Sequence, residues 1–198
     1  MARNSPVFIE QGLRPEHRDA AVDLFWEAFK GKLAPVMQPE ARALSFLRTA
    51  VDPAHAISAV SDQGELLGIA GFKTADGGFV GGGMRDVCAA YGLTGGIWRS
   101  LTLSVLDRPV EEGSLLMDGI FVAEAARGQG IGTILLDAVK QKARELGSAS
   151  VRLDVIDSNP RARALYERQG FVAQETSETG PFRYVFGFQS STRMICTL

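Results

Sequence analysis

The stretch that decides the fold is Arg127-Gly128-Gln129-Gly130-Ile131-Gly132-Thr133, which lies between an apolar run and an amphipathic run. The apolar run, residues 115–122, predicts a buried strand, and residues 131–146 have the apolar spacing of a helix. A helix that begins after such a turn presents unpaired N–H groups and the positive end of its dipole, which attract phosphate. Glycine also lacks the Cβ that would hold a ligand away from the backbone. The segment therefore predicts a site for a phosphorylated cofactor.

Three classes of cofactor site are alternative interpretations of this turn. A P-loop requires a lysine directly after its last glycine, and Lys140 comes two helical turns too late. A dinucleotide fingerprint requires Gly-x-Gly-x-x-Gly, and the acid expected about 20 residues on, Asp154, reads as internal to a strand. The third pattern, Gln/Arg-x-x-Gly-x-Gly/Ala of acyl-coenzyme A N-acyltransferases, fits Arg127, Gly130 and Gly132 position by position. Nicotinamide binding ranks last of the alternatives that remain open.

A second motif lies downstream and reads Asn159-Pro160-Arg161-Ala162-Arg163-Ala164-Leu165-Tyr166-Glu167-Arg168-Gln169-Gly170-Phe171. Asn159 before Pro160 is typical of a helix N-cap with proline at the first helical position, and Gly170 of a helix stop. Tyr166 follows Asn159 by two turns, so both side chains lie near one face, roughly 10 Å apart along the axis. We therefore expect a short helix that presents Tyr166.

Together the two motifs resemble those of the GNAT N-acetyltransferase superfamily, which pairs the first turn with Asn-x-x-Ala-x-x-Leu-Tyr-x-x-x-Gly-Phe. The resemblance implies an α/β fold: a mixed, mostly antiparallel central sheet with a parallel βαβ core and helices on both faces. It implies acetyl-coenzyme A as co-substrate, with no metal. Tyr166 would be the general acid, and Asn159 would cap its helix, touch the cofactor, or do both.

The resemblance also assigns the remaining cofactor contacts. The turn would hold the pyrophosphate through residues Arg127, Gly128, Gln129, Gly130, Ile131, Gly132 and Thr133. The backbone of the preceding strand would pair with the pantetheine arm like another strand, through Ile120, Phe121 and Val122. One of those N–H groups would face the thioester carbonyl, and a fixed donor of this kind stabilises developing negative charge.

The general base is open between two carboxylates, Asp118 and Asp154. Each is expected within a strand of the βαβ unit, and relatives carry a catalytic glutamate near either position. Strict alternation would place Asp118 on one face with Leu116, Ile120 and Val122. A structural ion pair, for instance with Arg152 or Arg183, is the alternative for either acid.

Composition limits the other function classes. The chain has 198 residues, 45% of them apolar, a length that suits one domain, here residues 6–198. A net charge of −2 disfavours a nucleic-acid binder, and no apolar run approaches the 18 residues of a membrane span. Two distant cysteines and two histidines give no metal-site spacing. We expect a cytoplasmic protein with neither a nucleic-acid nor a membrane partner.

The remaining elements follow from periodicity. Helices are predicted over residues 15–29 and 39–51, and strands over 7–13, 56–60, 66–74, from Phe79 onward, 151–156 and 182–188. Turn residues 62–65 join the second and third of these strands as a hairpin. The last strand, residues 182–188, would offer an edge that a second copy could share, so a homodimer is possible.

One segment, about residues 81–113, departs from the family pattern as a helical insert. Glycines frame two helical stretches, one containing Tyr91 and the other containing Trp98 and Val105. Loops grafted onto a scaffold often carry specificity, so Tyr91 and Trp98 are candidates for the acceptor pocket. They could equally anchor the insert to the sheet.

The sequence thus predicts an N-acyltransferase that moves an acetyl group from acetyl-coenzyme A to a primary amine of a small molecule or a peptide. A domain that binds coenzyme A or an acyl thioester as a sensor, without turnover, is the alternative. The identity of the amine is open, because one fold can serve many acceptors.

Overall fold

The computed structural model describes residues 6–104 and 107–198, so the expected position of Val105 lies outside the described residues. One sheet runs through the molecule in the order β1-β2-β3-β5-β6-β8-β7, and β4 pairs with β3 at its side. Its strands are β1 (Val7–Gln11), β2 (Ala56–Ser61), β3 (Leu66–Thr74), β4 (Gly77–Gly78), β5 (Ser114–Val122), β6 (Ser150–Ile156), β7 (Val172–Glu178) and β8 (Ser190–Thr197).

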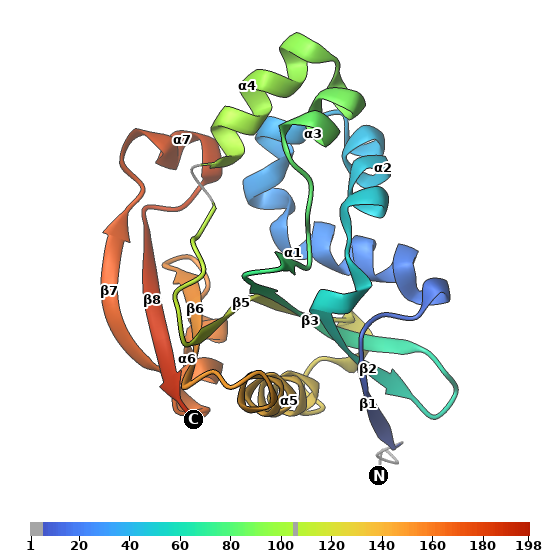
Figure 1. Cartoon of the computed structure of the whole chain (residues 1–198), viewed down its shortest axis with the longest axis vertical. Helices are drawn as coiled ribbons and strands as arrows, with labels where there is room; N and C mark the ends of the chain where they lie inside the picture. Colours follow the sequence, from blue (N-terminus) through green and yellow to red (C-terminus); the bar gives the residue numbers. More distant parts are fainter. Residues whose placement is uncertain (1–5, 105–106) are drawn as a thin grey trace.

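Helices cover both faces of this sheet (Figure 1). On one face lie α1 (Arg18–Met37), α2 (Glu40–Ala50), α3 (Met84–Tyr91) and α4 (Leu93–Leu103), with the short α7 (Arg183–Phe186) beside α1. On the other face lie α5 (Ile131–Glu145) and α6 (Pro160–Arg168). The expected mixed α/β fold with helices on both faces is confirmed.

Two apolar cores result, one under each helix layer. The core under α1 contains the aromatic group Phe25, Phe29, Phe79 and Phe121, whose neighbouring ring centroids lie 4.8 to 6.3 Å apart. The core under α5 is aliphatic and contains Leu135, Leu136 and Val139 of that helix, which are fully buried. The apolar stripe that predicted α5 is the stripe that packs on the sheet.

The βαβ unit β5–α5–β6 contains the one parallel pair among the described strands, as predicted. The pairing is short: Ser114, Leu115 and Leu116 pair with Ser150, Val151 and Arg152, and no pair follows. Since β5 continues to Val122, its carboxyl-terminal half has no strand partner on the β6 side. The sheet therefore opens between β5 and β6 next to the start of α5.

Several predicted boundaries require correction. The first helix runs eight residues past Phe29, to Met37, with Pro35 inside it. The strand expected from Phe79 onward is the two-residue β4, which precedes it, while Val80 forms an isolated bridge with Val51. Phe79 itself is buried in the α1 core and closes a backbone bond to Phe72.

The prediction of a final strand at residues 182–188 is wrong. Gly180–Phe182 forms a 3-10 turn, Arg183–Phe186 is a helical turn, and Gly187 (φ 71°) ends it in the left-handed region. The aromatic residues of this segment suggested a strand, but Phe186 and Phe188 instead pack into the α1 core. The edges of the sheet are β1 and β7, so the edge predicted for a homodimer does not exist as a strand.

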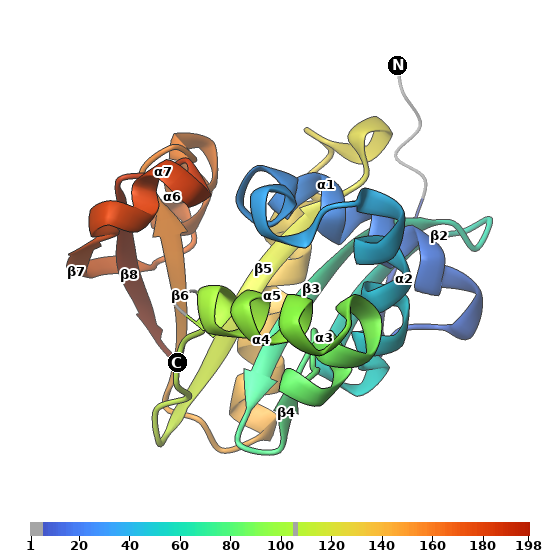
Figure 2. The ribbon, with the colours of Figure 1, turned by 90° about the horizontal axis from the view of Figure 1, so that it is seen from above.

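The insert contains the two predicted helices, α3 and α4, with Gly92 between them at φ 77°. An added Cβ at Gly96 of α4 would lie 2.4 Å from the Cα of Cys88 in α3, so this glycine permits the close crossing of the two helices. Figure 2 shows the pair lying above the sheet near α1 and α2. The insert thus forms a wall above the α1 face.

Candidate active site

The glycine-rich turn has the geometry of an anion cradle. Gly128 (φ 79°) and Gly130 (φ 84°) take left-handed conformations, and Gly130 is the N-cap of α5. An added Cβ at either glycine would meet no protein atom within 4 Å, so the space in front of the turn is open. The sequence therefore uses glycine here for its backbone conformation and for access, two requirements that other residues do not meet together.

Five consecutive backbone N–H groups, those of residues 128–132, donate to no acceptor within the described chain. They line the positive end of the α5 dipole, which favours bound anions. Two side chains brace the turn: Arg127 Nε donates to the Val122 carbonyl at 3.2 Å, and Gln129 Nε2 to the Ala125 carbonyl at 2.8 Å. The Thr133 N–H instead closes the first turn on the Gly130 carbonyl.

The second motif folds beside this cradle. Asn159 Oδ1 accepts from the Ala162 N–H at 3.1 Å, and Gly170 takes φ 85° after the last turn of α6, so both predicted helix ends are confirmed. Leu165 reaches the first turn of α5, where its Cδ2 would lie 3.1 Å from a Cβ at Gly132. The structure thus brings the two motifs together, and Gly132 permits that contact.

Tyr166 is buried, with 7% of its surface exposed, and its ring packs against Phe171 at 5.9 Å between centroids. Burial raises the pKa of its phenol to about 12, so the hydroxyl stays protonated at neutral pH. In the described chain that hydroxyl has no hydrogen-bond partner. The hydroxyl oxygen is not among the fully buried unpartnered polar atoms of the described chain, so solvent or a ligand atom can reach it.

The carboxyl-terminal half of β5, which has no strand partner on the β6 side, contains Ile120, Phe121 and Val122. These residues pair with β3 only. Alternate residues of a strand direct their N–H and C=O groups to opposite neighbours. Some backbone groups of this half therefore face the gap towards β6. A coenzyme A fits these features: the cradle matches a pyrophosphate, and the unpartnered strand edge matches the amides of a pantetheine arm.

A β-bulge at Asp118 breaks the alternation of β5. Gly119 pairs with Gly71 and Met117 with Phe72, so Asp118 has no direct partner on β3. As a result Ile120 and Val122 pack in the core under α5, whereas Asp118 faces the α1 side. The prediction that Asp118 shares a face with these two residues was wrong, because one extra residue reverses the pattern.

Asp118 lies on the wall of an open cavity and is the exposed residue of β5, so water can reach its carboxyl. Burial raises the pKa of its carboxyl to about 6, and the nearby Lys73 ammonium and the Phe79 backbone partly offset this effect. No cationic group of the described chain forms an ion pair with it. A carboxyl with this pKa is mostly ionised at neutral pH and can still accept a proton.

Asp154 has a different environment. Its Oδ2 accepts from Nη2 of Arg152 at 3.3 Å, and Arg152 is 1% exposed. Glu111 completes the arrangement, with ion pairs to Arg152 at 2.7 Å and to Arg193 at 3.2 Å. The structural pairing considered for Asp154 is therefore present with Arg152, whereas Arg183 hydrogen-bonds to the Tyr184 hydroxyl.

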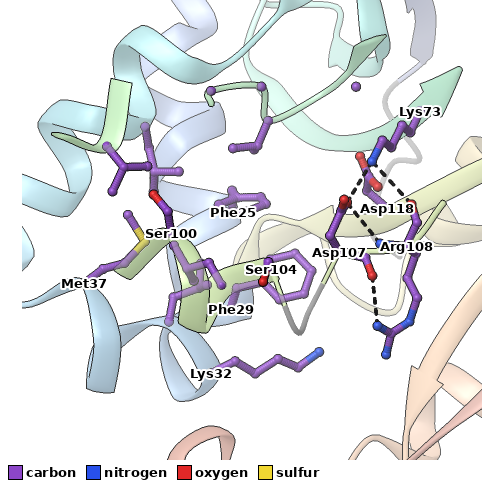
Figure 3. Close-up of a pocket in the computed structure, with 18 of the residues that line it drawn as sticks. Phe25, Phe29, Lys32, Met37, Lys73, Ser100, Ser104, Asp107, Arg108 and Asp118 are labelled. Carbon is purple, nitrogen blue, oxygen red and sulfur yellow. Dashed lines mark hydrogen bonds and ion pairs between the residues drawn. The ribbon is translucent and has the colours of Figure 1, made fainter. Parts of the chain in front are cut away.

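The cavity beside Asp118 measures about 650 Å³ and lies between the sheet, α1, α2 and the insert (Figure 3). Its apolar end is formed by Phe25, Phe29, Leu33, Met37, Phe46 and Leu47. Its charged end carries Lys32, Lys73, Arg108, Asp107, Asp118 and Asp154. A volume of this size suits a small molecule. Lys32, Lys73 and Asp107 belong to no motif, so sequence reasoning did not identify them.

Tyr91 and Trp98, the predicted acceptor residues, are not among the residues that line this cavity. Tyr91 is buried, donates from its hydroxyl to the Met37 carbonyl at 2.7 Å, and lies under the guanidinium of Arg99 at 4.3 Å. Trp98 is 45% exposed. The insert instead reaches the cavity through Met84, Val87, Ser100 and Leu103.

Two further observations concern residues 6–104 and 107–198. No helix there is long and apolar enough to cross a bilayer. Nor does that part of the chain bring three or more histidine, cysteine, aspartate or glutamate side chains together in a way that could hold a metal ion.

Known proteins resemble this chain in sequence and in fold. Residues 18–171 match the Acetyltransferase (GNAT) family. A curated relative, thialysine N-epsilon-acetyltransferase of Bos taurus, is 37% identical over 65 residues, which is 33% of this chain and 37% of that protein. The chain therefore aligns with little more than a third of the length of that relative.

Solved structures share the fold across nearly the whole chain. An N-acetyltransferase from Staphylococcus aureus Mu50 superposes with a TM-score of 0.63 at 15% identity, covering 95% of this chain and 99% of that one. A Bacillus subtilis acetyltransferase in complex with CoA gives 0.58 at 17% identity, covering 98% and 99%. At these identities the likeness concerns the fold alone, whereas the family match spans both motifs. The chain belongs to the GNAT acetyltransferase family.

Proposed function

We propose that this protein is an N-acetyltransferase that transfers an acetyl group from acetyl-coenzyme A to a primary amine. The observation that carries the proposal is the junction of two half-sites at the β5–β6 opening. A cradle of free N–H groups lies on the α5 side, and a cavity with an unpaired carboxylate, that of Asp118, lies on the α1 side.

Residues 128–132 would hold the pyrophosphate of the cofactor, with Arg127, Gln129 and Thr133 keeping the turn in shape. The free edge of β5 at residues 120–122 would hold the pantetheine arm. Asn159 serves here as the cap of α6, and that role accounts for its contacts. When bound, acetyl-coenzyme A supplies an acyl thioester, which an amine can attack.

Asp118 is the proposed base. The acceptor enters as an ammonium ion, and the carboxylate, directly or through one water, removes the proton that blocks attack. Its pKa of about 6 keeps most of the group ionised at neutral pH. Asp154 is already paired with Arg152, so its proposed role is to neutralise the charge of that buried guanidinium at the cavity wall.

Tyr166 is the proposed general acid. Its O–H donates to the sulfur as the carbon–sulfur bond breaks, and the second proton released by the acylated nitrogen replaces the one it gives up. The pKa of about 12 holds that proton on the phenol until negative charge develops nearby. A backbone N–H of residues 120–122 would polarise the carbonyl in the same step.

Two assays test the proposal. Calorimetry with acetyl-coenzyme A should detect binding, and release of free thiol in the presence of a panel of primary amines should detect turnover. Binding without turnover for any amine would favour a sensor of acyl thioesters. Absence of binding to coenzyme A and its esters would remove the basis of the proposal.

A further inference from the structure

The carboxylates of the cavity differ in whether the protein already neutralises them. Lys73 pairs with Asp107 at 2.8 Å, and Arg152 pairs with Asp154 at 3.3 Å. Asp118 lines the same cavity and has no cation within ion-pair distance in the part of the chain that the structure describes. Asp118 is therefore the carboxylate of the cavity that is left to receive one positive group of a ligand.

An aromatic surface begins directly beside this carboxylate. The β-bulge leaves both Asp118 and Gly119 on the α1 side of β5. A Cβ added at Gly119 would lie 3.6 Å from Cζ of Phe29 and 3.0 Å from the ring of Phe121. The backbone of Phe79, whose ring belongs to the same aromatic group, is near enough to lower the pKa of Asp118. An amine held by Asp118 would therefore have aromatic carbon next to its first methylene groups.

The apolar surface continues along α1. Phe25, Phe29, Leu33 and Met37 follow one another at intervals of four residues and all line the cavity, and we call them the α1 wall. From Phe29 to Met37 the helix rises by roughly 12 Å. Figure 3 shows the rings of Phe25 and Phe29 between Met37 and Asp118. The second helix and the insert add further apolar residues to the lining: Phe46, Leu47, Met84, Val87 and Leu103.

A second charge on the ligand would be unfavourable at this site. A second ammonium would find no free carboxylate among the described lining residues, because Asp107 and Asp154 are already paired. It would also be repelled by the Lys32 ammonium, which lies 5.0 Å from the centroid of Phe29. A carboxylate beside the amine would lie close to Asp118 and to Asp107, whose like charge already raises the pKa of Asp118. Burying such an unpaired charge costs free energy.

We propose that the acceptor is an apolar primary amine, whose single ammonium faces Asp118 and whose uncharged alkyl or arylalkyl body lies along the α1 wall. This inference rests on the proposed function, since it names the acceptor class of the same site. Burial of the body against the α1 wall would supply the binding free energy. The cost of an unpaired second charge would exclude diamines and free amino acids.

Matched probes that differ in one group test the proposal. Pentylamine and cadaverine (1,5-diaminopentane) differ by a second ammonium, and phenethylamine and L-phenylalanine differ by a carboxylate. L-phenylalaninamide has nearly the size of L-phenylalanine without the negative charge. Binding to the protein saturated with coenzyme A is measured by calorimetry, so the readout does not depend on turnover.

The wild-type protein should bind pentylamine at least tenfold more tightly than cadaverine, and phenethylamine at least tenfold more tightly than L-phenylalanine. The affinity for L-phenylalaninamide should lie between those for phenethylamine and L-phenylalanine. From propylamine to pentylamine, affinity should rise about fourfold per added methylene, the expected gain for a buried methylene group.

Leu33→Ala tests the α1 wall. Leu33 is half-buried and lines the cavity, whereas Leu24 is half-buried on the same helix, packs against the same core and does not line the cavity. Leu33→Ala should weaken the binding of pentylamine by about tenfold and that of propylamine less. Leu24→Ala is the matched control and should change neither. Leu33→Glu places a carboxylate one turn beyond Phe29, so cadaverine should then bind more tightly than pentylamine.

Three results would overturn the inference alone. The first is equal or tighter binding of cadaverine or L-phenylalanine by the wild type. The second is an equal loss of affinity in Leu33→Ala and Leu24→Ala, or an unchanged order of the two amines in a Leu33→Glu protein that still binds coenzyme A. The third is the absence of binding for every probe while coenzyme A binds. Failure of coenzyme A itself to bind would count against the proposed function, and the inference would fall with it.

Discussion

The cofactor half and the acceptor half of this molecule differ in the groups that form them, which are mainly backbone groups in the first and side chains in the second. In the cofactor half, residues 120–133 and 159–171, backbone groups form most of the site, and local sequence places them: glycines at the start of α5 and an Asn-Pro cap before α6. In the acceptor half, side chains form the site, and they come from α1, β3, β5, β6 and the insert. A backbone site can be read from a short motif, whereas a side-chain site requires the tertiary fold.

This difference predicts how the two halves respond to substitution. Changes in the cofactor half should alter the affinity for coenzyme A or the release of its thiol, whichever amine is offered. Changes in the acceptor half should alter proton removal or the choice of amine and leave the affinity for coenzyme A unchanged. The following variants test this separation in order of expected effect.

The largest effect should follow from Tyr166→Phe. The variant keeps the ring that packs on Phe171 but removes the proton donor, so kcat should fall by about a hundredfold or more. Affinity for acetyl-coenzyme A should change little. Tyr184→Phe is the matched control, because that residue is 80% exposed. Steady-state kinetics and calorimetry check both, and an unchanged kcat in Tyr166→Phe would exclude it as the general acid.

Asp118→Asn should lower kcat/KM by about tenfold to a hundredfold at neutral pH. In the wild-type protein kcat/KM should rise with pH through about 6, as the carboxyl of Asp118 loses its proton, and this rise should be absent in the variant. Because the folded state raises this pKa, the wild type should lose stability as pH increases from about 4 to 6. Asp118→Asn should therefore melt at a higher temperature than wild type at pH 8. A rise in rate near pH 6 that persists in the variant would assign the base elsewhere.

Asp154→Asn should show the opposite pattern. Removing this carboxylate leaves the buried Arg152 with Glu111 as its remaining ion-pair partner, so the variant should lose about 1–3 kcal/mol of stability. Its rate should be affected less than that of Asp118→Asn when both are assayed well below their melting temperatures. Should Asp154→Asn keep its stability and lose its rate, the roles of the two acids would have to be exchanged.

Gly130→Ala and Gly147→Ala form a matched pair at the two ends of α5. Both glycines have positive φ, and an added Cβ would meet open space at either, so each variant should lose about 1 kcal/mol of stability. Gly130 alone faces the anion cradle. Its variant should bind coenzyme A about tenfold more weakly by calorimetry, a loss comparable to one charge-assisted hydrogen bond. Equal affinities in the two variants would contradict the assignment of the cradle.

The smallest effect is expected from Tyr91→Phe, which removes the hydrogen bond to the Met37 carbonyl. The cost should be about 1 kcal/mol, or a fall of roughly 2–4 °C in the melting temperature of a chain of this length. The KM for the amine should be unchanged, because Tyr91 does not line the cavity. Thermal melts and acceptor kinetics check this. A shift in acceptor preference would indicate that Tyr91 contributes to the acceptor pocket.

The sequence predicted the features of the cofactor half better than those of the acceptor half. The glycine turn and both ends of α6 are local features, and the parallel β5–β6 pair follows from the strand–helix–strand order. The structure contains all of them. The bulge at Asp118 was missed because it arises from the register between β3 and β5, which no local pattern shows. Lys32 was missed for a similar reason, since its place in the cavity depends on the elements that α1 packs against.

The misassigned segment at residues 182–188 shows the limit of residue preference. Aromatic and β-branched residues favour strands in general. Here Gly180 and Gly187 frame a helical turn, and burial of Phe186 and Phe188 against α1 decides the conformation. The true strands β7 and β8 are rich in serine, threonine and charged residues, so they were not recognised as strands.

The most direct test of the central claim is a residue-resolved amide NMR titration of the protein with coenzyme A. The claim is that the cofactor occupies the backbone half-site and reaches the cavity through the β5–β6 opening. The account predicts large shifts for the N–H groups of residues 128–132 and for residues 120–122 of β5, with small shifts in α3 and α4. Shifts confined to the α1 side of the sheet, or absent from both segments, would contradict it.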